Sequence, residues 1–333
     1  MGDQMGVCTK VKNLCKRFPV CAEEYGVDRR EFDSKVAWLR FWDALLPRGK
    51  SKAYIEGLSE YVCRELTPIT ERYARGEWKQ PTPIQKLDKI PVWVCWWQGE
   101  ESMPPIVKAC VRRLKNSLPE TAELHLITWD NFADYCDIPA HVLEKYHEGS
   151  FGPAHLADIL RYALLSSYGG AWIDSTVWLT DRIQDKLPEY LEQMYFTQRF
   201  LDWSCCPQEA CRGKWCNFFF MGRSDCMLFS YVYEALLSWW EHHDRLIDYV
   251  AVDYVIWAGY CGVPEIKRLI DAVPANNEQI WSMAKALNDA YESAKFDDLI
   301  SDNDFYKLSY KGRLEEKMDG KLTIYGHILK ENR

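Results

Sequence analysis

The first 88 residues carry apolar side chains at helical spacing. Between residues 54 and 73, these side chains recur every three or four positions over five turns: Tyr54, Ile55, Leu58, Tyr61, Val62, Leu66, Ile69 and Tyr73. Such a period places them along one face of a helix. The pattern stops at Gln80-Pro81-Thr82-Pro83, because proline interrupts regular backbone. We therefore expect residues 1–88 to form a helical extension that precedes a differently patterned core.

Beyond this segment the spacing of apolar residues alternates between that of strands and that of helices. The β-branched and aromatic run Val92–Trp97 predicts a buried strand that ends in a loop at Gln98-Gly99-Glu100. Residues 106–114 predict a helix, and residues 124–128 predict a second short strand. Asp130 follows that strand, where a helix N-cap is expected.

This rhythm is typical of a mostly parallel α/β sheet with flanking helices. We expect the core at residues 89–273, followed by a polar helical segment at residues 274–333 that packs on the core. A short apolar run, residues 322–329, lies near the end. In such sheets, ligands bind beyond the carboxyl ends of the strands, so the residues after each strand are the candidates for function.

Residues 151–168 predict a helix with one apolar face, formed by Leu156, Ile159, Leu160, Ala163 and Leu164. Asp158 and Arg161 are three positions apart on the opposite face, so their side chains are neighbours. For an isolated pair, the usual interpretation is an ion pair on a solvated helix surface.

The residues that follow this helix change that interpretation. Gly169-Gly170 ends the helix, since glycine accepts positive φ angles. A short strand, residues 171–176, comes next and carries Asp174 near its carboxyl end. Strand alternation places Trp172, Asp174 and Thr176 on one side. A carboxylate at this position is a suitable oxygen ligand for the divalent cation of a pyrophosphate ligand.

Charge and cysteine content narrow the function classes. The net charge is −8, which argues against nucleic acid as the main partner. The basic residues nearest the N-terminus are Lys10, Lys12, Lys16, Arg17, Arg29 and Arg30. They indicate either a solvated face or weak attraction to an anionic membrane surface. The sequence contains neither G-x-G-x-x-G after a strand nor a Walker A loop, so dinucleotide enzymes and P-loop NTPases are disfavoured.

The 13 cysteines are an odd number without disulfide-framework spacing. The chain begins without an apolar leader, and its apolar runs fall short of the ~18 residues that span a bilayer. We therefore expect a cytoplasmic protein with free thiols. Cys205, Cys206, Cys211 and Cys216 could hold zinc, but their spacing favours buried thiols.

The ordered motifs Ala157-Asp158-Ile159-Leu160-Arg161-Tyr162, Gly169-Gly170 and Trp172-Ile173-Asp174 resemble those of DXD-containing glycosyltransferases of the GT-A fold. The nearest resemblance is to bacterial capsular polysaccharide synthesis proteins. More distant relatives are the initiating α-mannosyltransferases of yeast and the large glucosylating bacterial toxins. Lys89-Ile90-Pro91 and Trp96-Trp97-Gln98-Gly99 match the family's first strand, and the resemblance covers roughly residues 88–260.

The resemblance implies a role for each matching residue. Asp158 and Arg161 would contact the sugar hydroxyls and diphosphate of the donor, and Asp174 would bind the ribose and approach a metal. Trp96 or Trp97, with Gln98, would face the uracil, and the other tryptophan would be a core residue. Asn217 would lie near the donor sugar. The family's second acidic residue is Thr176 here, and a hydroxyl is a poorer cation ligand than a carboxylate.

Three arrangements could compensate for Thr176. Asp174 alone could hold Mn²⁺ or Mg²⁺ together with waters and phosphates. His327 could supply a further metal ligand. A basic residue, such as Lys311 or Lys330, could replace the charge of the cation.

A second carboxylate, Asp253, lies within an apolar helical stripe formed by Tyr249, Val252, Ile256 and Trp257. Since a buried, unpaired carboxylate is costly, it needs a structural partner or a function. Its function would be to position the acceptor or to stabilise positive charge on the sugar.

The expected activity is transfer of a hexosyl group from a UDP-sugar to a hydroxyl of a saccharide or lipid-linked saccharide, with retention implied by the relatives. If the basic N-terminal residues bind lipid, the enzyme would act at the inner face of the membrane. One alternative is a glycoside hydrolase that uses Asp174 and Asp253. The other is a non-catalytic nucleotide-sugar-binding protein, which the presence of Thr176 makes worth testing.

Overall fold

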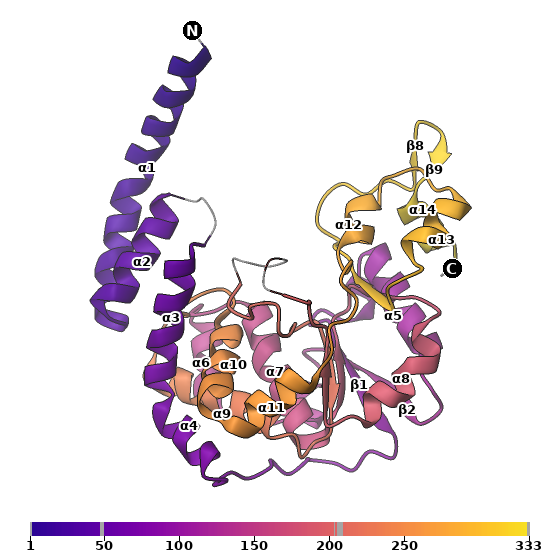
Figure 1. Ribbon diagram of the computed structural model, residues 1–333, viewed down its shortest axis with the longest axis horizontal. Coiled ribbons are helices and arrows are strands. Elements are labelled where there is room, and N and C mark those ends of the chain that lie inside the picture. Colours follow the sequence, from indigo (N-terminus) through magenta and orange to yellow (C-terminus); the bar gives the residue numbers. More distant parts are fainter. Residues whose placement is uncertain (1, 47–49, 203, 205–208, 332–333) are drawn as a thin grey trace.

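The computed structural model describes residues 2–46, 50–202, 204 and 209–331 (Figure 1). Among these residues, a central five-stranded sheet has the order β2-β1-β3-β6-β5. Its strands are β1 (Ile90–Cys95), β2 (Ala122–Ile127), β3 (Gly170–Ile173), β5 (Tyr195–Thr197) and β6 (Phe219–Gly222). β1 is parallel to β2 and β3, whereas β6 is antiparallel to β3 and β5. Only β6 is therefore reversed, and the predicted GT-A-like, mostly parallel α/β fold is confirmed.

The apolar run that predicted β1 is buried on both faces, as expected for a central strand. Val92, Trp93 and Val94 are fully buried. The strand ends at Cys95, two residues earlier than predicted, so Trp96 and Trp97 lie in the loop that follows. This loop leads into the short 3₁₀ helix η1 (Glu100–Ser102).

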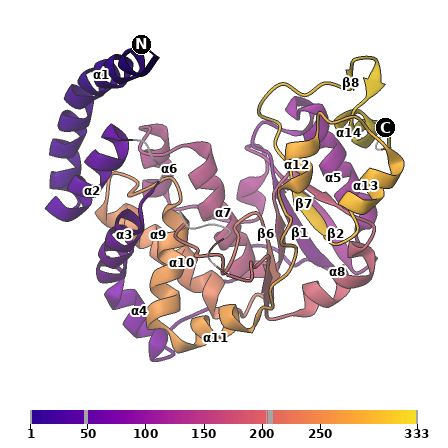
Figure 2. The ribbon, with the colours of Figure 1, turned by 45° about the horizontal axis from the view of Figure 1, so that its top comes forward.

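Helices cover both faces of the sheet (Figure 2). On one side lie α7 (Pro153–Tyr168), α9 (Met227–His242), α10 (Ala251–Gly262) and α11 (Pro264–Ala272). On the other side lie α5 (Pro105–Ser117) and α8 (Ile183–Glu192). The predicted helices at residues 106–114 and 151–168 are thus confirmed. α7 packs against β1 and β3, which brings its polar face to the carboxyl ends of these strands.

A two-glycine turn joins α7 to β3. The φ angles of Gly169 and Gly170 are +70° and +86°. A Cβ at Gly170 would lie 2.0 Å from the carbonyl oxygen of Pro91, and a Cβ at Gly169 would lie 2.6 Å from the amide nitrogen of Ser224. Both positions therefore require glycine on conformational and steric grounds. The tight turn returns the chain along α7 and places Asp174 beside that helix.

The N-terminal region is helical, as predicted. It comprises α1 (Gly2–Glu31), α2 (Ser34–Leu45), α3 (Lys52–Glu65) and α4 (Thr67–Ala74). The hairpin of α1 and α2 projects from the body of the molecule in Figure 1, whereas α3 and α4 pack on α10. The prediction of one continuous helix over residues 54–73 was wrong. Pro68, in the first turn of α4, lacks the amide hydrogen needed to continue α3, so the helix breaks at Leu66.

The C-terminal region is less helical than predicted. It contains α12 (Ser282–Ala286), α13 (Ser293–Leu299) and α14 (Ile324–Glu331). It also contains β7 (Phe305–Lys307), which pairs with β4 (Val177–Leu179), and a hairpin of β8 (Lys317–Met318) and β9 (Lys321–Leu322). β4 follows β3 after a short turn, so β7 reaches the same edge of the core as Asp174.

Two smaller features complete the fold. Asp130 does not cap a helix, because Asn131 precedes the 3₁₀ helix η2 (Phe132–Asp134) and its side chain accepts a hydrogen bond from the Thr128 amide at 2.8 Å. α6 (Ala140–His147) follows. Within the described part of the chain, every helix is too short or too polar to cross a bilayer.

Candidate functional site

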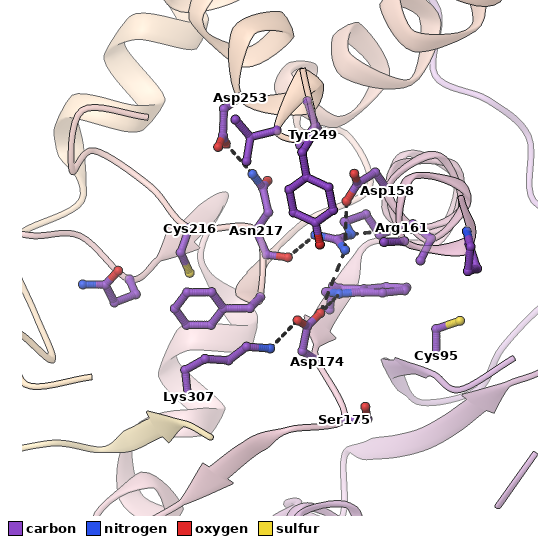
Figure 3. Close-up of a pocket in the computed structure, with 18 of the residues that line it drawn as sticks. Cys95, Asp158, Arg161, Asp174, Ser175, Cys216, Asn217, Tyr249, Asp253 and Lys307 are labelled. Atoms are coloured by element: carbon purple, nitrogen blue, oxygen red, sulfur yellow. Dashed lines mark hydrogen bonds and ion pairs between the residues drawn. The ribbon is translucent and has the colours of Figure 1, made fainter. Parts of the chain in front are cut away.

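A cavity of about 660 Å³ opens beyond the carboxyl ends of β1 and β3. Its lining comes from the loop after β1, from α7, from the turn after β3, from the segment before β6, and from α10 and β7. This volume is in the range of small-molecule sites. Figure 3 labels five charged residues of the cavity, which come from segments far apart in the sequence: Asp158, Arg161, Asp174, Asp253 and Lys307.

Arg161 lies between two carboxylates of this cavity. Its Nη2 atom is 3.0 Å from Asp158 Oδ1 and 3.9 Å from Asp174 Oδ1. Its Nη1 atom donates a hydrogen bond to the backbone oxygen of Asn217, and its guanidinium carbon lies 4.9 Å from the ring centre of Trp172. The side chains of Asp158 and Arg161 are only 13% and 9% exposed. The usual interpretation of such a pair, a solvated surface ion pair, is therefore wrong here.

The neighbouring carboxylates of Asp158 and Asp174 keep Arg161 protonated. Burial alone would lower the pKa of the guanidinium, but Asp158 and Asp174 outweigh this effect and raise it. A buried charge of this kind is tolerated only when it is paired and hydrogen bonded. Arg161 therefore joins α7, β3 and the segment before β6 into one charged cluster, with little of its own surface left for a ligand.

Asp174 follows β3 directly and is held by partners on both carboxylate oxygens. Oδ1 accepts a hydrogen bond from Trp172 Nε1 at 2.9 Å, and Oδ2 accepts one from Lys307 Nζ at 2.5 Å. Burial would raise the pKa of Asp174, but Lys307 and Arg161 outweigh it and lower the pKa. Lys307 also donates to Thr176 Oγ1 at 2.8 Å, so Asp174 and Thr176 lie on one side, as predicted. The predicted strand over residues 171–176 was too long, because β3 ends at Ile173 and both residues lie in the turn that leads into β4.

Lys307 is the site residue that the sequence prediction missed. It belongs to β7, where it lies opposite Val177 of β4. The available signal was a lysine within the otherwise apolar run Phe305-Tyr306-Lys307-Leu308. The lysines named instead, Lys311 and Lys330, are exposed and lie outside the cavity lining.

The predicted contribution of His327 is also not found. His327 lies on α14, outside the cavity lining, where its ring stacks on Tyr291 at 3.8 Å. Its Nε2 atom is 3.1 Å from the carboxylate of Glu331. The i, i+4 spacing on α14 pairs His327 with Glu331, one turn later.

The residues around Asp174 do not fit a divalent cation. Such a cation prefers several oxygen ligands, and carboxylates above all. Of the pair Asp174 and Thr176, only Asp174 offers a carboxylate, whereas Thr176 offers a hydroxyl. Lys307 already contacts both side chains. Across the described residues, no group of three or more histidine, cysteine, aspartate or glutamate side chains could hold a metal.

The cysteine group gives no sign of a metal either. Cys211 and Cys216 are buried thiols, as expected, and burial raises the pKa of Cys216 to about 11. A thiolate, which metal binding requires, is therefore disfavoured at Cys216. The other two members of the group, Cys205 and Cys206, lie outside the described residues.

Asp253, on α10, forms the opposite wall of the cavity. Its Oδ1 atom accepts hydrogen bonds from Trp215 Nε1 at 2.9 Å and from Asn217 Nδ2. Asn217 is fixed in turn by the Tyr162 hydroxyl, which donates to its Oδ1 at 2.9 Å. Both partners of Asp253 are neutral, and burial raises its pKa to about 7. A structural and a functional interpretation are therefore both compatible with the position of Asp253, since it has structural partners and also lines the cavity.

The structure separates the two tryptophans after β1. Trp97 is a core residue, stacked on Trp129 at 4.4 Å between ring centres, and its Nε1 donates to the Pro153 carbonyl. Trp96 is half-buried, donates to Ser102 Oγ at 2.8 Å, and meets the edge of Tyr310. Trp96 and the exposed Gln98 both line the cavity. Trp96 is therefore the better candidate for stacking with a planar ligand.

Comparison with known proteins extends the similarity beyond these motifs. The model of the family described as "Capsular polysaccharide synthesis protein" matches residues 53–328, which crosses the predicted domain boundaries at 88 and 273. The chain is also 29% identical over 118 residues to the O-glycosyltransferase PaGT of Phomopsis amygdali, covering 32% of this chain and 27% of that protein. The match thus spans about a quarter of the relative's length. No solved structure matches. With the family match running from α3 to α14, this chain belongs to the capsular polysaccharide synthesis protein family.

Proposed function

We propose that this protein is a glycosyltransferase that moves a hexosyl group from a UDP-sugar to a hydroxyl of a saccharide or lipid-linked saccharide. The product would belong to a capsular or other surface polysaccharide. The observation that carries the proposal is the cluster of Asp158, Arg161 and Asp174 in one cavity at the carboxyl end of β3. The family match and the name of the fungal relative support the reaction class.

In this proposal the UDP moiety lies along the wall formed by β1, β3 and β7. The uracil stacks on Trp96 beside Gln98, and Asp174 accepts a hydrogen bond from the ribose. The diphosphate then meets the positive charge of Lys307, whose side chain is 22% exposed in the cavity. Arg161 lies behind Asp174 and adds positive charge to the same wall.

In this proposal Asp158 and Asn217, which both line the cavity, contact the hydroxyls of the donor sugar. Bond cleavage gives the sugar oxocarbenium character and leaves negative charge on the diphosphate. Fixed positive charge in a site of low dielectric stabilises that charge without reorganisation during the reaction. Arg161 suits this task, because Asp158 and the Asn217 carbonyl hold its guanidinium in place.

Asp253 would act on the acceptor side. A carboxylate with a pKa near 7 can accept the proton of an acceptor hydroxyl, and its ionised form can stabilise positive charge on the sugar. Its hydrogen-bond partners, Trp215 and Asn217, are neutral, unlike the cations beside Asp174. The resemblance to retaining GT-A enzymes supports retention of the anomeric configuration.

The test is a UDP-release assay with a pool of UDP-hexoses and a mixed pool of saccharide acceptors. UDP release that depends on the acceptor is the expected result. Asp181→Asn is a matched control that should release UDP like wild type, because Asp181 is an exposed carboxylate outside the cavity. UDP binding without turnover would identify a non-catalytic binding protein. Release of sugar from saccharides without any nucleotide would identify a glycoside hydrolase. Absence of UDP binding would overturn the proposal.

A location at the inner face of the membrane is part of the proposal, because a lipid-linked acceptor is presented there. The hairpin of α1 and α2 exposes the aromatic side chains of Phe18, Trp38 and Trp42. Lys16 and Arg17 are exposed next to Phe18 on α1. Aromatic and basic side chains together suit the interface of an anionic leaflet. The side chains of Lys10 and Lys12 lie outside the described part of the structure.

Co-sedimentation with vesicles of phosphatidylcholine and phosphatidylglycerol tests this location. Binding should weaken in the Trp38→Ala/Trp42→Ala variant and with rising salt, since basic residues contribute through screened electrostatics. Ile84→Ala is a matched control, because Ile84 is an exposed apolar residue outside the hairpin. Equal binding of all three proteins, or none at low salt, would leave the hairpin with a role in packing or in acceptor docking only.

A further inference from the structure

We propose that Lys307 takes the place of the divalent cation, so that this enzyme binds and releases its nucleoside diphosphate without a metal ion. The inference rests on the proposed function and assigns the cationic partner of the diphosphate. It concerns a residue of β7 that lies far from the motifs of α7 and β3 in the sequence.

The position of the ammonium group carries the inference. Lys307 Nζ lies 2.5 Å from Asp174 Oδ2 (Figure 3). The same atom lies 2.8 Å from Thr176 Oγ1. These two side chains occupy the positions at which a D-x-D pattern presents its carboxylates to a cation. The ammonium is therefore bound by the same pair of side chains that would otherwise hold the metal.

The charge count agrees with this substitution. Two carboxylates and a divalent cation sum to zero, and so do one carboxylate and one lysine. Exchange of the second carboxylate for Thr176 removes one negative charge, and exchange of the cation for Lys307 removes one positive charge. Both exchanges together preserve the neutrality of the site, whereas either alone would leave it charged and costly to bury.

Backbone contacts fix Lys307 at this position. Its amide donates to the Ile280 carbonyl at 2.9 Å, and the amide of Leu308 donates to the Thr176 carbonyl at 2.9 Å. Antiparallel pairing of β7 with β4 sets the register. The ammonium has three N–H groups, of which Asp174 and Thr176 take two. The third can reach a phosphate oxygen in the cavity, which Lys307 lines.

A metal ion at Asp174 would meet unfavourable surroundings. Its nearest neighbours would include the ammonium of Lys307 and the guanidinium of Arg161, which lies 3.9 Å from Asp174 Oδ1. Like charges at such distances repel strongly in a partly buried site. The cation would also have to displace Lys307 from both oxygen ligands before it could bind.

The experiment measures UDP affinity by titration calorimetry for the full-length protein, in EDTA and in Mn²⁺. Wild type should bind UDP with the same Kd, within about twofold, in both media. Lys307→Ala and the length-preserving Lys307→Met should each weaken binding about tenfold or more, equivalent to about 1.4 kcal/mol. Lys311→Ala is the matched control, because it removes an exposed lysine four residues away, and it should bind like wild type.

A double variant exchanges the lysine for a metal site. Thr176→Asp/Lys307→Ala restores two carboxylates and removes the ammonium, so UDP binding should become dependent on Mn²⁺. Direct Mn²⁺ binding, followed by electron paramagnetic resonance without nucleotide, should appear in this variant and be absent from wild type. Melting temperatures measured alongside show that each variant is folded.

The outcomes separate the inference from the function on which it rests. UDP binding by wild type that is lost in EDTA and restored by Mn²⁺ overturns the inference and leaves the proposed function intact. Unchanged UDP affinity in both Lys307 variants, measured in EDTA, also overturns it. Wild type that binds no UDP in either medium contradicts the proposed function itself.

Discussion

Asp174 and Asp253 line the same cavity from opposite walls, in contrasting electrostatic surroundings. Asp174 is in contact with Lys307 and close to Arg161, and these cations lower its pKa against the effect of burial. Asp253 is buried beside the neutral donors Trp215 and Asn217, and burial raises its pKa to about 7. One wall therefore carries fixed charge, whereas the other carries a group that can exchange a proton near neutral pH.

The difference shows how one residue type can serve two tasks in a single site. Environments that push two carboxyl pKa values apart are typical of enzymes that need both charge stabilisation and proton transfer. In the proposed function, the cationic wall binds the diphosphate of the donor, and the Asp253 wall binds the acceptor hydroxyl. Asn217 connects the walls, since its backbone carbonyl accepts a hydrogen bond from Arg161 and its side-chain amide donates one to Asp253.

The largest effect is expected from loss of the Asp174 charge. Asp174→Asn removes the anion that binds Lys307 and lies 3.9 Å from Arg161, so kcat/KM should fall about 100-fold, equivalent to about 2.7 kcal/mol. UDP affinity should fall as well. Steady-state kinetics and calorimetry measure the two effects, and Asp181→Asn serves as the control on the exposed surface.

A smaller loss is expected when Arg161 is replaced by lysine. Arg161→Lys keeps the charge but cannot contact Asp158, the Asn217 carbonyl and Asp174 together, because only the guanidinium has a planar set of donors. We expect kcat to fall about 30-fold, equivalent to about 2 kcal/mol, in a protein that remains folded. Full activity in both this variant and Asp174→Asn would show that the site lies elsewhere.

The Asp253 wall should respond to pH. Asp253→Asn should lower kcat about tenfold, equivalent to about 1.4 kcal/mol, and should remove an inflection near pH 7 from the rate profile. An unchanged inflection in the variant would assign that titration to another group.

The same variant tests the stability cost of the raised pKa. Folding raises the pKa of Asp253 from 3.8 to about 7, so the folded state holds this proton more tightly than the unfolded chain does. Its stabilising contribution is complete below about pH 4 and is lost as pH rises towards 7. Asn does not titrate, so the Tm of Asp253→Asn should rise relative to that of wild type between pH 5 and 8, by about 1–2 °C per kcal/mol for a chain of 333 residues. A constant difference across this range would contradict the assignment.

The smallest effect is expected at Trp96, the proposed uracil contact. Trp96→Ala should raise the Kd of UDP about fivefold, equivalent to about 1 kcal/mol, the lower end of the range for stacking of a base on an aromatic ring. Trp97→Ala is the paired variant, and it should mainly lower the Tm because Trp97 packs in the core. Unchanged UDP affinity in Trp96→Ala would show that the base does not stack on Trp96.

Local sequence patterns were sufficient to predict much of the fold and the cluster of Asp158, Arg161 and Asp174. The change from helical to alternating period predicted the α/β core. Asp158 and Arg161 are three positions apart on a helix, and the Gly169-Gly170 turn returns the chain so that Asp174 follows β3 beside that helix. These relations depend on spacing along one short segment, which the sequence determines directly.

Only the tertiary structure decided which distant residues complete the site. Lys307 reaches Asp174 across 133 positions in the sequence, through the pairing of two three-residue strands. Strands this short have no distinctive period, and their register depends on the packing of the whole C-terminal segment, so Lys311, Lys330 and His327 were named instead. The same holds for the two tryptophans, because only the folded chain decides that Trp97 rather than Trp96 is buried. It also holds for Asp253, whose neutral donors come from a distant segment of the sequence.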